Sequence, residues 1–503
     1  MTTRKRPVSK QLVSLLAVSA MSIALVAVAA PAQAAVRCGG KRATIVGRNG
    51  NDANLRGTRR ADVIAARGGI DTINGLGGSD IICAGPGGDF IFGGGGNDRI
   101  LGQGGDDVMT GEAGGDSLVG GKGTLDIGFY GFATAPVTAN LDTGVATGEG
   151  SDRLSGLEAL FGSPLADRFT GDARANTIFG EDGNDTLIGG GGVDGLDGGL
   201  GDDDLDGGAD LDLVFYNSGE QPVVADLSLN RVTGQGTDSL ANFEVVVGST
   251  STSPDTFIGD DAPNYFLPEG GPDIVRGGGG FDMLMYFDSP QGVDVDLTQG
   301  RGGPGEAEGQ TFESIEGVWG SPQADRLVGS GGNDLLLADA GNDVVDARAG
   351  DDMVSGGDGD DDLDGGQGTR DLIDYELAVA GVAVDLQAGE ATGGEGTDSL
   401  ANFEEVFGSF FDDTLGGNSG ANNLWGWFGQ DVLRGFGGND TLVGGLVDGS
   451  SDGDADQLDG GDGTDQCGAD VADTASLCEG PGIPPIHPLA NDADAASRIR
   501  RNH

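Results

Sequence analysis

Histidine, cysteine and basic side chains are scarce in this sequence. Its 503 residues include two histidines and four cysteines, and 27 Lys and Arg residues stand against 82 Asp and Glu residues. The two histidines, His487 and His503, both lie near the C-terminus. Transition metals prefer imidazole or thiolate ligands, so the body of the chain offers no site for them. The Cys-x-x-Cys spacing of zinc sites is also missing.

Positive charge is too scarce for several classes of partner. The formal net charge is −55. A field of that sign repels phosphate, so we expect no nucleic-acid partner, and anionic membranes are disfavoured for the same reason. Aromatic residues make up 6% of the chain and 100 residues are glycine. A flexible acidic chain of this kind is normally disordered unless it contains a regular apolar pattern and its charge is neutralised.

Long apolar runs are missing except at the N-terminus. Basic residues between Arg4 and Lys10 precede an apolar stretch from about Leu12 to Ala30, and Ala32-Gln33-Ala34 has the small-x-small pattern of a cleavage site. We therefore predict a cleaved signal peptide over residues 1–34 and a secreted, extracellular protein. The alternative is an uncleaved membrane anchor, since the run is long enough to span a bilayer. No second apolar span follows, so no membrane span is expected after cleavage.

The four cysteines lie in two pairs, one near each end of the predicted mature chain. Cys38 and Cys83 form the N-terminal pair, and Cys467 and Cys478 form the C-terminal pair. In an exported protein we expect each pair to form a disulfide. Four cysteines allow three pairings, and the sequence alone does not choose among them.

A nine-residue repeat dominates what the chain does contain. Glycine fills most positions before each repeated aspartate, and an apolar residue stands two places after it. The first run has the aspartates Asp62, Asp71, Asp80, Asp89, Asp98, Asp107 and Asp116, followed by Ile64, Ile73, Ile82, Ile91, Ile100, Met109 and Leu118. A fixed period of this kind indicates a repeat architecture and argues against a disordered linker.

The repeats fall into five blocks joined by spacers of similar length. We predict a signal peptide (1–34), an N-terminal block with a disulfide (35–130), blocks at 167–216, 255–286 and 325–375, spacers at 131–166, 217–254, 287–324 and 376–412, a C-terminal block with a disulfide (413–480) and a flexible tail (481–503). The third block is shorter by 18 residues, which is two repeats, and the phase survives. The nonapeptides therefore behave as modular coils.

The spacers repeat as well. Each of the first four blocks ends in Asp-x-x-x-Tyr, and each spacer contains a strand-like run such as Val382–Leu386 and closes on an apolar-Glu-x-x-apolar-Gly-Ser pattern. The block-ending tyrosines are Tyr130, Tyr216, Tyr286 and Tyr375. We expect these tyrosines, and also Trp319, Trp425 and Trp427, to cap the apolar ladder. An exposed Trp425/Trp427 pair that binds sugar is the alternative.

The period predicts an all-β fold, a parallel β-solenoid in several blocks joined by strand-containing spacers. Six glycine-rich residues make a turn, because several turn positions need backbone angles that glycine adopts at little cost. Three residues make a short strand whose central apolar side chain points inward. Two nonapeptides complete one flattened coil, and coils must stack because one coil cannot bury its own apolar face.

Stacked turns place carboxylates and free carbonyl oxygens in rows at each edge. Carboxylates about 5 Å apart repel one another. A Ca²⁺ ion between levels removes that repulsion, since it accepts six to eight oxygen ligands, including backbone carbonyls. Mg²⁺ demands a tighter octahedron and retains its water. The pattern therefore favours calcium.

These nonapeptides resemble the RTX, or haemolysin-type, calcium-binding repeat. Gly75-Leu76-Gly77-Gly78-Ser79-Asp80 and Gly435-Phe436-Gly437-Gly438-Asn439-Asp440 show the pattern, and the resemblance covers most of residues 46–465. The resemblance implies a parallel β-roll in which each Ca²⁺ lies between a turn and the same-side turn two repeats later. It also implies that the sixth turn residue is the carboxylate ligand. About 10–18 ions are expected on this basis.

The resemblance assigns the calcium ligands residue by residue. The carboxylate ligands are Asp62, Asp71, Asp80, Asp89, Asp98, Asp107, Asp116, Asp185, Asp194, Asp203, Asp212, Asp273, Asp282, Asp325, Asp334, Asp343, Asp352, Asp361, Asp431 and Asp440. The carbonyl ligands come from glycines of the turns, such as Gly75, Gly77, Gly93, Gly95, Gly198, Gly277, Gly279, Gly356 and Gly435.

Several segments depart from the pattern. Asn176, Asn264 and Asn422 replace the aspartate, which predicts weak or missing sites there. The stretch from Asp448 to Asp465 is out of register. Its Asp452-x-Asp454-x-Asp456 start is similar to an EF-hand loop, but Gln457 and Gly463 occupy the positions where that loop needs glycine and glutamate. A solvated acidic loop is the favoured interpretation.

No enzyme is predicted. Gly115-Asp116-Ser117-Leu118 and Gly449-Ser450-Ser451-Asp452-Gly453 match hydrolase strings, but neither has a histidine base, and the repeat already explains the first. The spacers are too short for a separate catalytic domain. The alternative is an extracellular enzyme or polysaccharide-active protein that uses the spacer segments.

The predicted export gives calcium a role in folding. Free Ca²⁺ is low inside cells and millimolar outside, so the acidic chain is expected to stay unfolded until export and to fold on binding the ion. The expected role is structural, surface-associated or adhesive. The expected partners are calcium ions and, as further candidates, glycans or proteins of the cell surface or matrix.

Overall fold

A computed structural model describes residues 36–219, 221–445, 454–468 and 473–480, together with His487 and Leu489. The predicted signal peptide, the start of the EF-hand-like stretch and most of the predicted tail lie outside the described residues. The described chain divides into two compact units. The first unit extends to Gly191 and includes Leu196–Gly201, and the second comprises Gly192–Gly195 and the chain from Asp202 onward.

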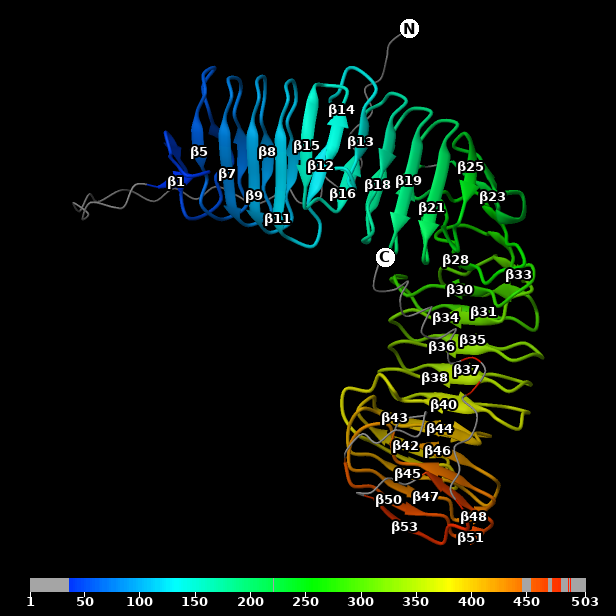
Figure 1. Cartoon of the computed structure of the whole chain (residues 1–503). Coiled ribbons are helices and arrows are strands. Elements are labelled where there is room, and N and C mark those ends of the chain that lie inside the picture. Colours follow the sequence, from blue (N-terminus) through cyan, green and yellow to red (C-terminus); the bar gives the residue numbers. More distant parts are fainter. Residues whose placement is uncertain are drawn as a thin grey trace. The chain divides into compact units, whose positions relative to one another are not determined.

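The described chain is an all-β parallel roll, as predicted. Most strands are three residues long, and the described residues contain no α-helix and one 3-10 turn, Leu227–Leu229. In each unit most strands belong to two sheets (Figure 1), and a separate pair of short strands is β1 (Arg37–Cys38) with β2 (Lys41–Arg42) in the first unit and β48 (Gly437–Gly438) with β51 (Asp462–Gly463) in the second. We call the sheet that is parallel throughout the continuous sheet, and the sheet that carries the spacer strands the meander sheet.

In the first unit, successive strands of one sheet lie 18 residues apart, so that Thr72, Phe90 and Val108 pair in register. The continuous sheet contains β4 (Leu55–Arg56), β6 (Thr72–Asn74), β8 (Phe90–Phe92), β10 (Val108–Thr110), β12 (Ile127–Phe129), β16 (Ala159–Phe161) and β18 (Thr177–Phe179). The meander sheet contains, in paired order, β3 (Ile45–Val46), β5 (Val63–Ala65), β7 (Ile81–Pro86), β9 (Arg99–Gly104), β11 (Ser117–Lys122), β15 (Ser151–Ser155), β14 (Val145–Thr147), β13 (Thr138–Asn140), β17 (Arg168–Thr170) and β19 (Thr186–Gly191).

The second unit repeats this plan. Its continuous sheet contains β22 (Leu213–Phe215), β26 (Val245–Val247), β28 (Tyr265–Leu267), β30 (Met283–Met285), β34 (Gly317–Trp319), β36 (Leu335–Leu337), β38 (Met353–Ser355), β40 (Leu372–Asp374), β44 (Glu405–Phe407), β46 (Asn423–Trp425), β49 (Thr441–Val443) and β52 (Gln466–Gly468). Its meander sheet contains β21 (Asp204–Ala209), β25 (Thr237–Ala241), β24 (Arg231–Thr233), β23 (Val224–Asp226), β27 (Thr256–Ile258), β29 (Ile274–Arg276), β33 (Thr311–Glu313), β32 (Arg301–Gly302), β31 (Asp294–Asp296), β35 (Arg326–Val328), β37 (Val344–Asp346), β39 (Asp362–Asp364), β43 (Thr397–Ala401), β42 (Glu390–Gly393), β41 (Val382–Asp385), β45 (Thr414–Gly416), β47 (Val432–Arg434), β50 (Gln457–Asp459) and β53 (Thr474–Ser476).

Each spacer folds as a meander of three strands. In the last spacer, β43 pairs in parallel with β39, β42 pairs antiparallel with β43 and β41, and β41 pairs in parallel with β45. The strand-like run at Val382 therefore forms β41. Because the meander starts and ends on parallel strands, the coil resumes in phase after it.

The interior contains the predicted apolar ladder. Ile64, Ile73, Ile82 and Ile100 are fully buried at the centres of their strands. The block-ending tyrosines are buried as well, and the hydroxyl of Tyr375 donates to Asp398 Oδ2 over 2.8 Å. Burial and these contacts fit their predicted role as caps of the ladder.

A second apolar cluster in the second unit was not predicted. In a strand, neighbouring side chains point to opposite faces. The residues on either side of the inward ladder therefore face outward, and in this continuous sheet they are apolar and buried. The cluster includes Leu213, Val245, Val247, Tyr265, Leu267, Met283, Met285, Trp319, Leu335, Leu337, Met353, Leu372, Phe407, Trp425 and Val443. We call this the outer apolar face.

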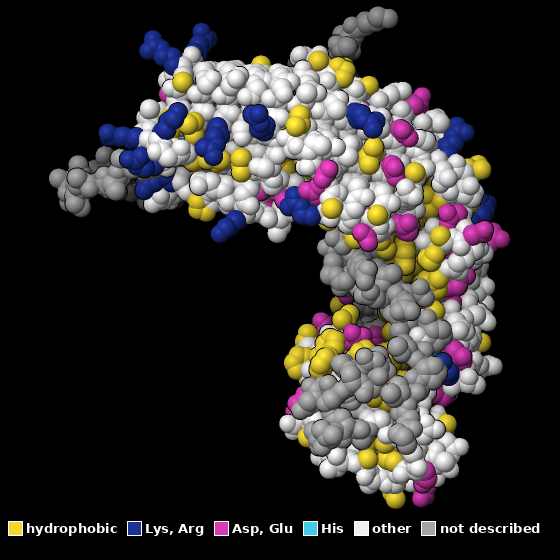
Figure 2. All heavy atoms as spheres, viewed as in Figure 1, with side chains coloured by type: hydrophobic (Ala, Val, Ile, Leu, Met, Phe, Trp, Pro, Cys, Tyr) yellow, Lys and Arg dark blue, Asp and Glu magenta, His cyan; other side chains and the backbone are white. Residues whose placement is uncertain are grey.

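Both predicted disulfides form. Cys38 is bonded to Cys83, which attaches the N-terminal hairpin of β1 (Arg37–Cys38) and β2 (Lys41–Arg42) to β7. Cys467 on β52 is bonded to Cys478. On the face shown in Figure 2, Lys and Arg side chains gather over the first unit and are sparse over the second. The described residues include no helix that is long and apolar enough to cross a membrane.

Candidate calcium-binding turns

The repeated aspartates form a hydrogen-bonded ladder along the turns. Oδ1 of Asp80 accepts the backbone N–H of Asp62 over 2.7 Å, and Oδ1 of Asp98 accepts that of Asp80 over 2.7 Å. The partners are 18 residues apart, which is one coil. The other row of turns does the same, since Asp89 Oδ1 accepts the N–H of Asp71 over 2.7 Å. The carboxylate thus caps the turn one coil earlier.

In many turns the second carboxylate oxygen of the ladder aspartate, Oδ2, accepts no hydrogen bond within the described part of the chain. This Oδ2 is buried and meets no hydrogen-bond donor among the described residues. The aspartates with this arrangement include Asp71, Asp80, Asp89, Asp98, Asp107, Asp116, Asp212, Asp282, Asp343, Asp352, Asp361, Asp371, Asp440 and Asp465. A buried carboxylate oxygen without a partner is costly, so it indicates a missing cation or proton. We call these open turns.

The space beside each open oxygen is lined by carbonyls. A methyl group added at Gly93 would lie 2.7 Å from Asp98 Oδ2 and 2.9 Å from the carbonyl oxygen of Gly111 in the turn one coil later. A methyl group at Gly102 would likewise meet Asp107 Oδ2 and the carbonyl of Gly120. Oxygens from two stacked turns therefore converge on one small volume, which we call a cradle. This oxygen environment suits Ca²⁺.

Left-handed backbone at two positions shapes an open turn. In the turn before Asp80, Leu76 has φ 73° and Gly78 has φ 107°. In the turn before Asp98, Gly94 and Gly96 have φ 101° and 143°. These second and fourth turn positions explain why glycine recurs there, because other residues adopt these angles at a cost.

A second class of turn is closed by its own backbone. Ser163 donates its N–H to Asp167 Oδ2 over 2.6 Å and its hydroxyl to Asp167 Oδ1 over 3.1 Å. Ser330 donates in the same way to Asp334, over 2.5 and 2.9 Å. The donor lies four residues before the acceptor, at the second turn position. The closed turns end at Asp62, Asp167, Asn176, Asn264, Asp325, Asp334, Asp413 and Asn422.

This division bears on the predicted ligands. Asp62, Asp325 and Asp334 lie in closed turns, where a protein donor already occupies Oδ2. Asp273 Oδ2 accepts the side-chain amide of Gln310 over 3.2 Å. These four carboxylates are poorer candidates than those in open turns. The asparagine turns, predicted to be weak sites, are closed as well.

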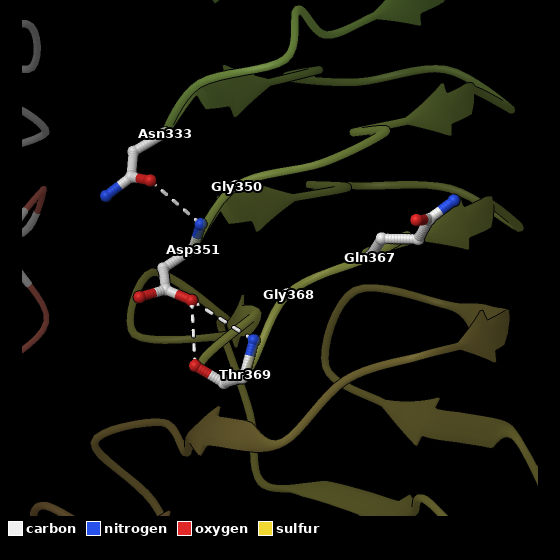
Figure 3. A pocket seen from close by; sticks show the side chains of 6 residues that line it. All are labelled: Asn333, Gly350, Asp351, Gln367, Gly368 and Thr369. Carbon is white, nitrogen blue, oxygen red and sulfur yellow. Dashed lines mark hydrogen bonds between the residues drawn. The ribbon is translucent and has the colours of Figure 1, made fainter.

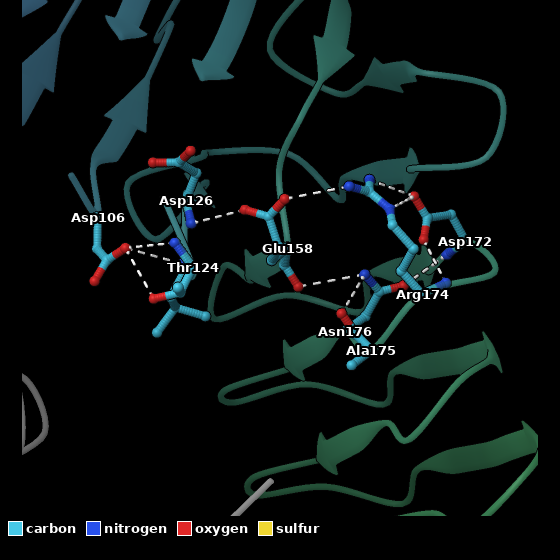
Figure 4. A network of polar contacts seen from close by, with 9 residues as sticks. Asp106, Thr124, Asp126, Glu158, Asp172, Arg174, Ala175 and Asn176 are labelled. Atoms are coloured by element: carbon cyan, nitrogen blue, oxygen red, sulfur yellow. Dashed lines mark hydrogen bonds and ion pairs between the residues drawn. The ribbon is translucent and has the colours of Figure 1, made fainter. Parts of the chain in front are cut away.

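The spacers also contribute to the ladder, which sequence reasoning missed. Glu158 Oε2 accepts the N–H of Asp126 over 3.0 Å, and Glu244, Glu316 and Glu404 take the same place after the later blocks (Figure 4). Each of these glutamates is the Glu of the apolar-Glu-x-x-apolar-Gly-Ser pattern that closes a spacer, so the sequence contained a signal for them. Asp152, Asp238 and Asp398, from the meanders, accept the N–H of Asp116, Asp203 and Asp361 in the same way.

Burial makes the open carboxylates expensive to ionise. Burial is the main cause that raises the pKa of Asp89, Asp107 and Asp116 to about 7, although the backbone hydrogen bond that each accepts opposes the shift. Neighbouring carboxylates raise these pKa values further. A bound divalent cation would offset both effects.

No group of three or more His, Cys, Asp or Glu side chains is placed to hold a metal in the part of the chain that the structure describes. The cradles combine a single carboxylate oxygen with backbone carbonyls instead. Such an oxygen-only set suits Ca²⁺ rather than zinc or copper.

Six stretches of the chain match a family model for the RTX calcium-binding nonapeptide repeat. They are residues 56–91, 92–124, 161–196, 319–354, 340–372 and 416–448. The chain contains RTX calcium-binding nonapeptide repeats. These RTX repeats include most of the open turns and leave out the meander spacers. A comparison with curated proteins found no match to the chain.

Outside the RTX turns the structure corrects one alternative. Trp425 is fully buried on the outer apolar face, and its ring packs edge-on against Phe407 with centroids 4.8 Å apart. Trp427 is partly buried beside the same ring. The idea of an exposed Trp425/Trp427 sugar-binding pair is therefore wrong. Trp425 is instead buried on the outward side of the continuous sheet.

One shallow groove lies on the turns of the second unit (Figure 3). It is lined by Asn333, Gly350, Asp351, Gln367, Gly368 and Thr369. Asn333 Oδ1 accepts the N–H of Asp351 over 2.9 Å, and Asp351 Oδ1 accepts the N–H and hydroxyl of Thr369 over 3.1 Å each. Asn333 and Asp351 precede their ladder aspartates by one position and Thr369 precedes Asp371 by two, and together they form a second, outer polar row. The groove is not on the spacer strands.

The ladder returns inside the out-of-register stretch, where Asp456 and Asp465 are buried and β50 forms, so the predicted solvated loop is wrong for residues 456–465. Asp456 Oδ1 accepts the N–H of Asp431 and Asp465 Oδ1 accepts that of Asp440, each over 2.9 Å. Asp456 thus serves as a ladder residue, and the hydrolase string at 449–453 lies outside the described residues. In the other string, Asp116 is a ladder residue and Ser117 begins β11.

Proposed function

We propose that this protein is exported and that its β-roll binds several Ca²⁺ ions at the open turns, folding on binding them outside the cell. The observation that carries the proposal is the convergence of a buried carboxylate oxygen in one turn with a carbonyl oxygen of the next stacked turn, as at Asp98 and Gly111. One ion in each such cradle neutralises part of the charge that would otherwise keep the chain unfolded.

The proposal gives the roll a structural, surface-associated or adhesive role and no catalysis. The outer polar row and the meanders offer polar surface to glycans or proteins, which are the proposed partners beyond calcium. Binding of the purified chain to isolated cell walls, with and without calcium, measures this role. Calcium-independent binding, or none, would argue against it.

Calcium titration followed by circular dichroism tests the central claim. We expect a coil spectrum in chelator and a β-sheet spectrum at millimolar Ca²⁺, with millimolar Mg²⁺ as the control that leaves the coil spectrum in place. A β-sheet spectrum that is the same in chelator would contradict the proposal. Isothermal titration calorimetry then counts the ions, of which we expect more than one for each unit.

Export is tested by sequencing the N-terminus of the protein recovered from the culture medium. We expect the mature chain to begin after Ala34. A chain that retains residues 1–34 and sediments with membranes would support the membrane-anchor alternative instead.

A further inference from the structure

The outer apolar face of the second unit needs a cover. Outward side chains on the meander sheet remain open to water, as Val344 on β37 shows with 45% exposure. On the continuous sheet the equivalent side chains of Met283, Leu335 and Leu372 are fully buried. An apolar strip of this length is not left in water by a stable protein, because its burial is favourable in proportion to its area.

A residue from the C-terminal segment belongs to this face. Leu489 is 6% exposed and packs in the same cluster as Leu372 and Phe407. Next to it, His487 Nε2 lies 3.1 Å from the carbonyl oxygen of Arg370, and His487 Nδ1 accepts the N–H of Leu489 over 3.3 Å. Because Nδ1 accepts, Nε2 carries the proton and donates to Arg370.

An ion pair beside this contact is also covered. Arg370 Nε lies 2.6 Å from Glu405 Oε1, and Asn423 Nδ2 donates to the same oxygen over 2.8 Å. Glu405 begins β44 and points outward with Leu372 and Phe407, yet its side chain is fully buried. A carboxylate on the outside of a roll is buried only when another part of the chain lies over it.

The reach of the chain fits an occupant from the same molecule. Gly480 pairs with Gln466 of β52, so it begins the next level of the roll. Five strand spacings separate that level from β40, which is about 24 Å. The seven-residue connection from Gly480 to His487 spans at most about 25 Å. The same copy can therefore place His487 beside Arg370.

We propose that His487 and Leu489 form an intramolecular strap, which docks on the outer apolar face beside β40 and seals the Arg370–Glu405 pair. The strap anchors through Leu489 in the apolar cluster and through His487 on the Arg370 carbonyl. It uses the face opposite the inward ladder, and it goes beyond the proposed calcium binding at the turns.

Photo-crosslinking of the full chain identifies the occupant. The variant Leu489→p-benzoylphenylalanine is irradiated at millimolar Ca²⁺ as an equal mixture of ¹⁴N and ¹⁵N copies. We expect same-isotope cross-links to the tryptic peptides 349–370 and 371–434, which contain β38 to β46. Mixed-isotope cross-links would show that a second copy occupies the face and would overturn the strap, as would cross-links elsewhere or none. Val224→p-benzoylphenylalanine is the control, because Val224 is 45% exposed on β23 and pairs with Thr233 and Thr256, so it should not label these peptides.

A substitution gives an independent readout. Leu489→Asp should cause a gain in the fluorescence of an added apolar dye at millimolar Ca²⁺, while the β-sheet circular dichroism stays unchanged. The matched control is Leu477→Asp, since Leu477 is 62% exposed and should leave the dye signal unchanged. An unchanged dye signal for Leu489→Asp would overturn the proposal. The unchanged β-sheet spectrum separates this result from a failure of calcium-driven folding.

Discussion

Oδ1 of Asp98 accepts the backbone N–H of Asp80 over 2.7 Å, although the two residues lie in different repeats. This one bond joins each turn to the turn one coil later. It occupies half of the carboxylate and leaves Oδ2 to face the carbonyls of the turns. The ladder therefore assigns each aspartate two tasks, one in holding the coils together and one in binding a cation.

Replacing a ladder aspartate by asparagine should separate those tasks. Asp98→Asn retains an oxygen acceptor for the N–H of Asp80 and removes the charge at Oδ2. We expect the variant to fold at millimolar Ca²⁺ and to bind about one ion fewer, because the cradle loses its carboxylate. Calorimetric titration counts the ions. Asp334→Asn in a closed turn is the control, and an equal loss there would contradict the division into open and closed turns.

Filling a cradle should block its ion. Gly93→Ala places a methyl group 2.7 Å from Asp98 Oδ2 and 2.9 Å from the Gly111 carbonyl. We expect a higher Ca²⁺ midpoint for folding and a loss of about 1–3 kcal/mol in the free energy of unfolding at saturating calcium, from overpacking. Gly95→Ala in the same turn meets nothing within 4 Å and serves as the control. Equal effects of the two variants would show that the cradle is not the site.

One residue should convert a closed turn into an open one. Ser330→Gly removes the hydroxyl that donates to Asp334, and it makes the turn at 329–334 identical in sequence to the open turn at 93–98. We expect the variant to bind about one more ion, because glycine accepts the left-handed angle of the second turn position. The reciprocal change, Gly94→Ser, should lose one ion. Unchanged calcium counts in both variants would show that the second position does not control the turn.

Stability should fall as pH rises because of two buried carboxylates, those of Asp374 and Glu395. Burial is the main cause that raises the pKa of Asp374 from 3.8 to about 7 and that of Glu395 from 4.5 to about 8. The folded chain therefore binds more protons than the unfolded chain between these values. The stability that this binding contributes is present in acid and is lost as pH rises through 7 to 8.

Glu395→Gln should flatten that dependence. At saturating calcium, we expect the urea midpoint of the native chain to fall between about pH 5 and pH 8, and that of the variant to fall less. Glu390→Gln on β42 is the control, because Glu390 is exposed. A variant with the same pH slope as the native chain would show that Glu395 is not responsible.

Much of the fold was predictable because it is periodic. The aspartate spacing indicates the coil, and the apolar residue two places on, such as Ile82, identifies the inward ladder. The block-ending Tyr375 and the strand-like run at Val382 indicate where a spacer interrupts the stack of nonapeptide coils. These features depend on residues close in sequence, so the pattern reveals them directly. The paired cysteines are another such feature, although their pairing needed the structure.

The candidate site was predictable only in part. Asp98 and Asp334 have the same place in the period, but only the structure shows that Ser330 donates to the carboxylate of Asp334. Glu158 lies outside the aspartate period, yet it caps Asp126 from 32 residues further along the chain, beyond the meander. Trp425 was expected to cap the ladder or to be exposed, and instead it lies on a second buried face. For Glu158 and Trp425 the partner comes from another coil, and for Asp334 the donor lies in the same turn.

The sequence by itself determined the period, the all-β roll, the inward apolar ladder and the row of carboxylates, because a nine-residue repeat places equivalent residues on equivalent sides of each coil. Only the tertiary structure decided which carboxylates retain an oxygen for a cation and which outward side chains are buried. The first property depends on hydrogen bonds within each turn, such as that from Ser330 to Asp334, and the second depends on packing between coils, where partners lie 18 to 117 residues apart. A donor at the second turn position, such as Ser330, changes which carboxylate oxygens can face a cation. A distant residue, Leu489, changes which outward side chains are buried. Neither changes the nine-residue period.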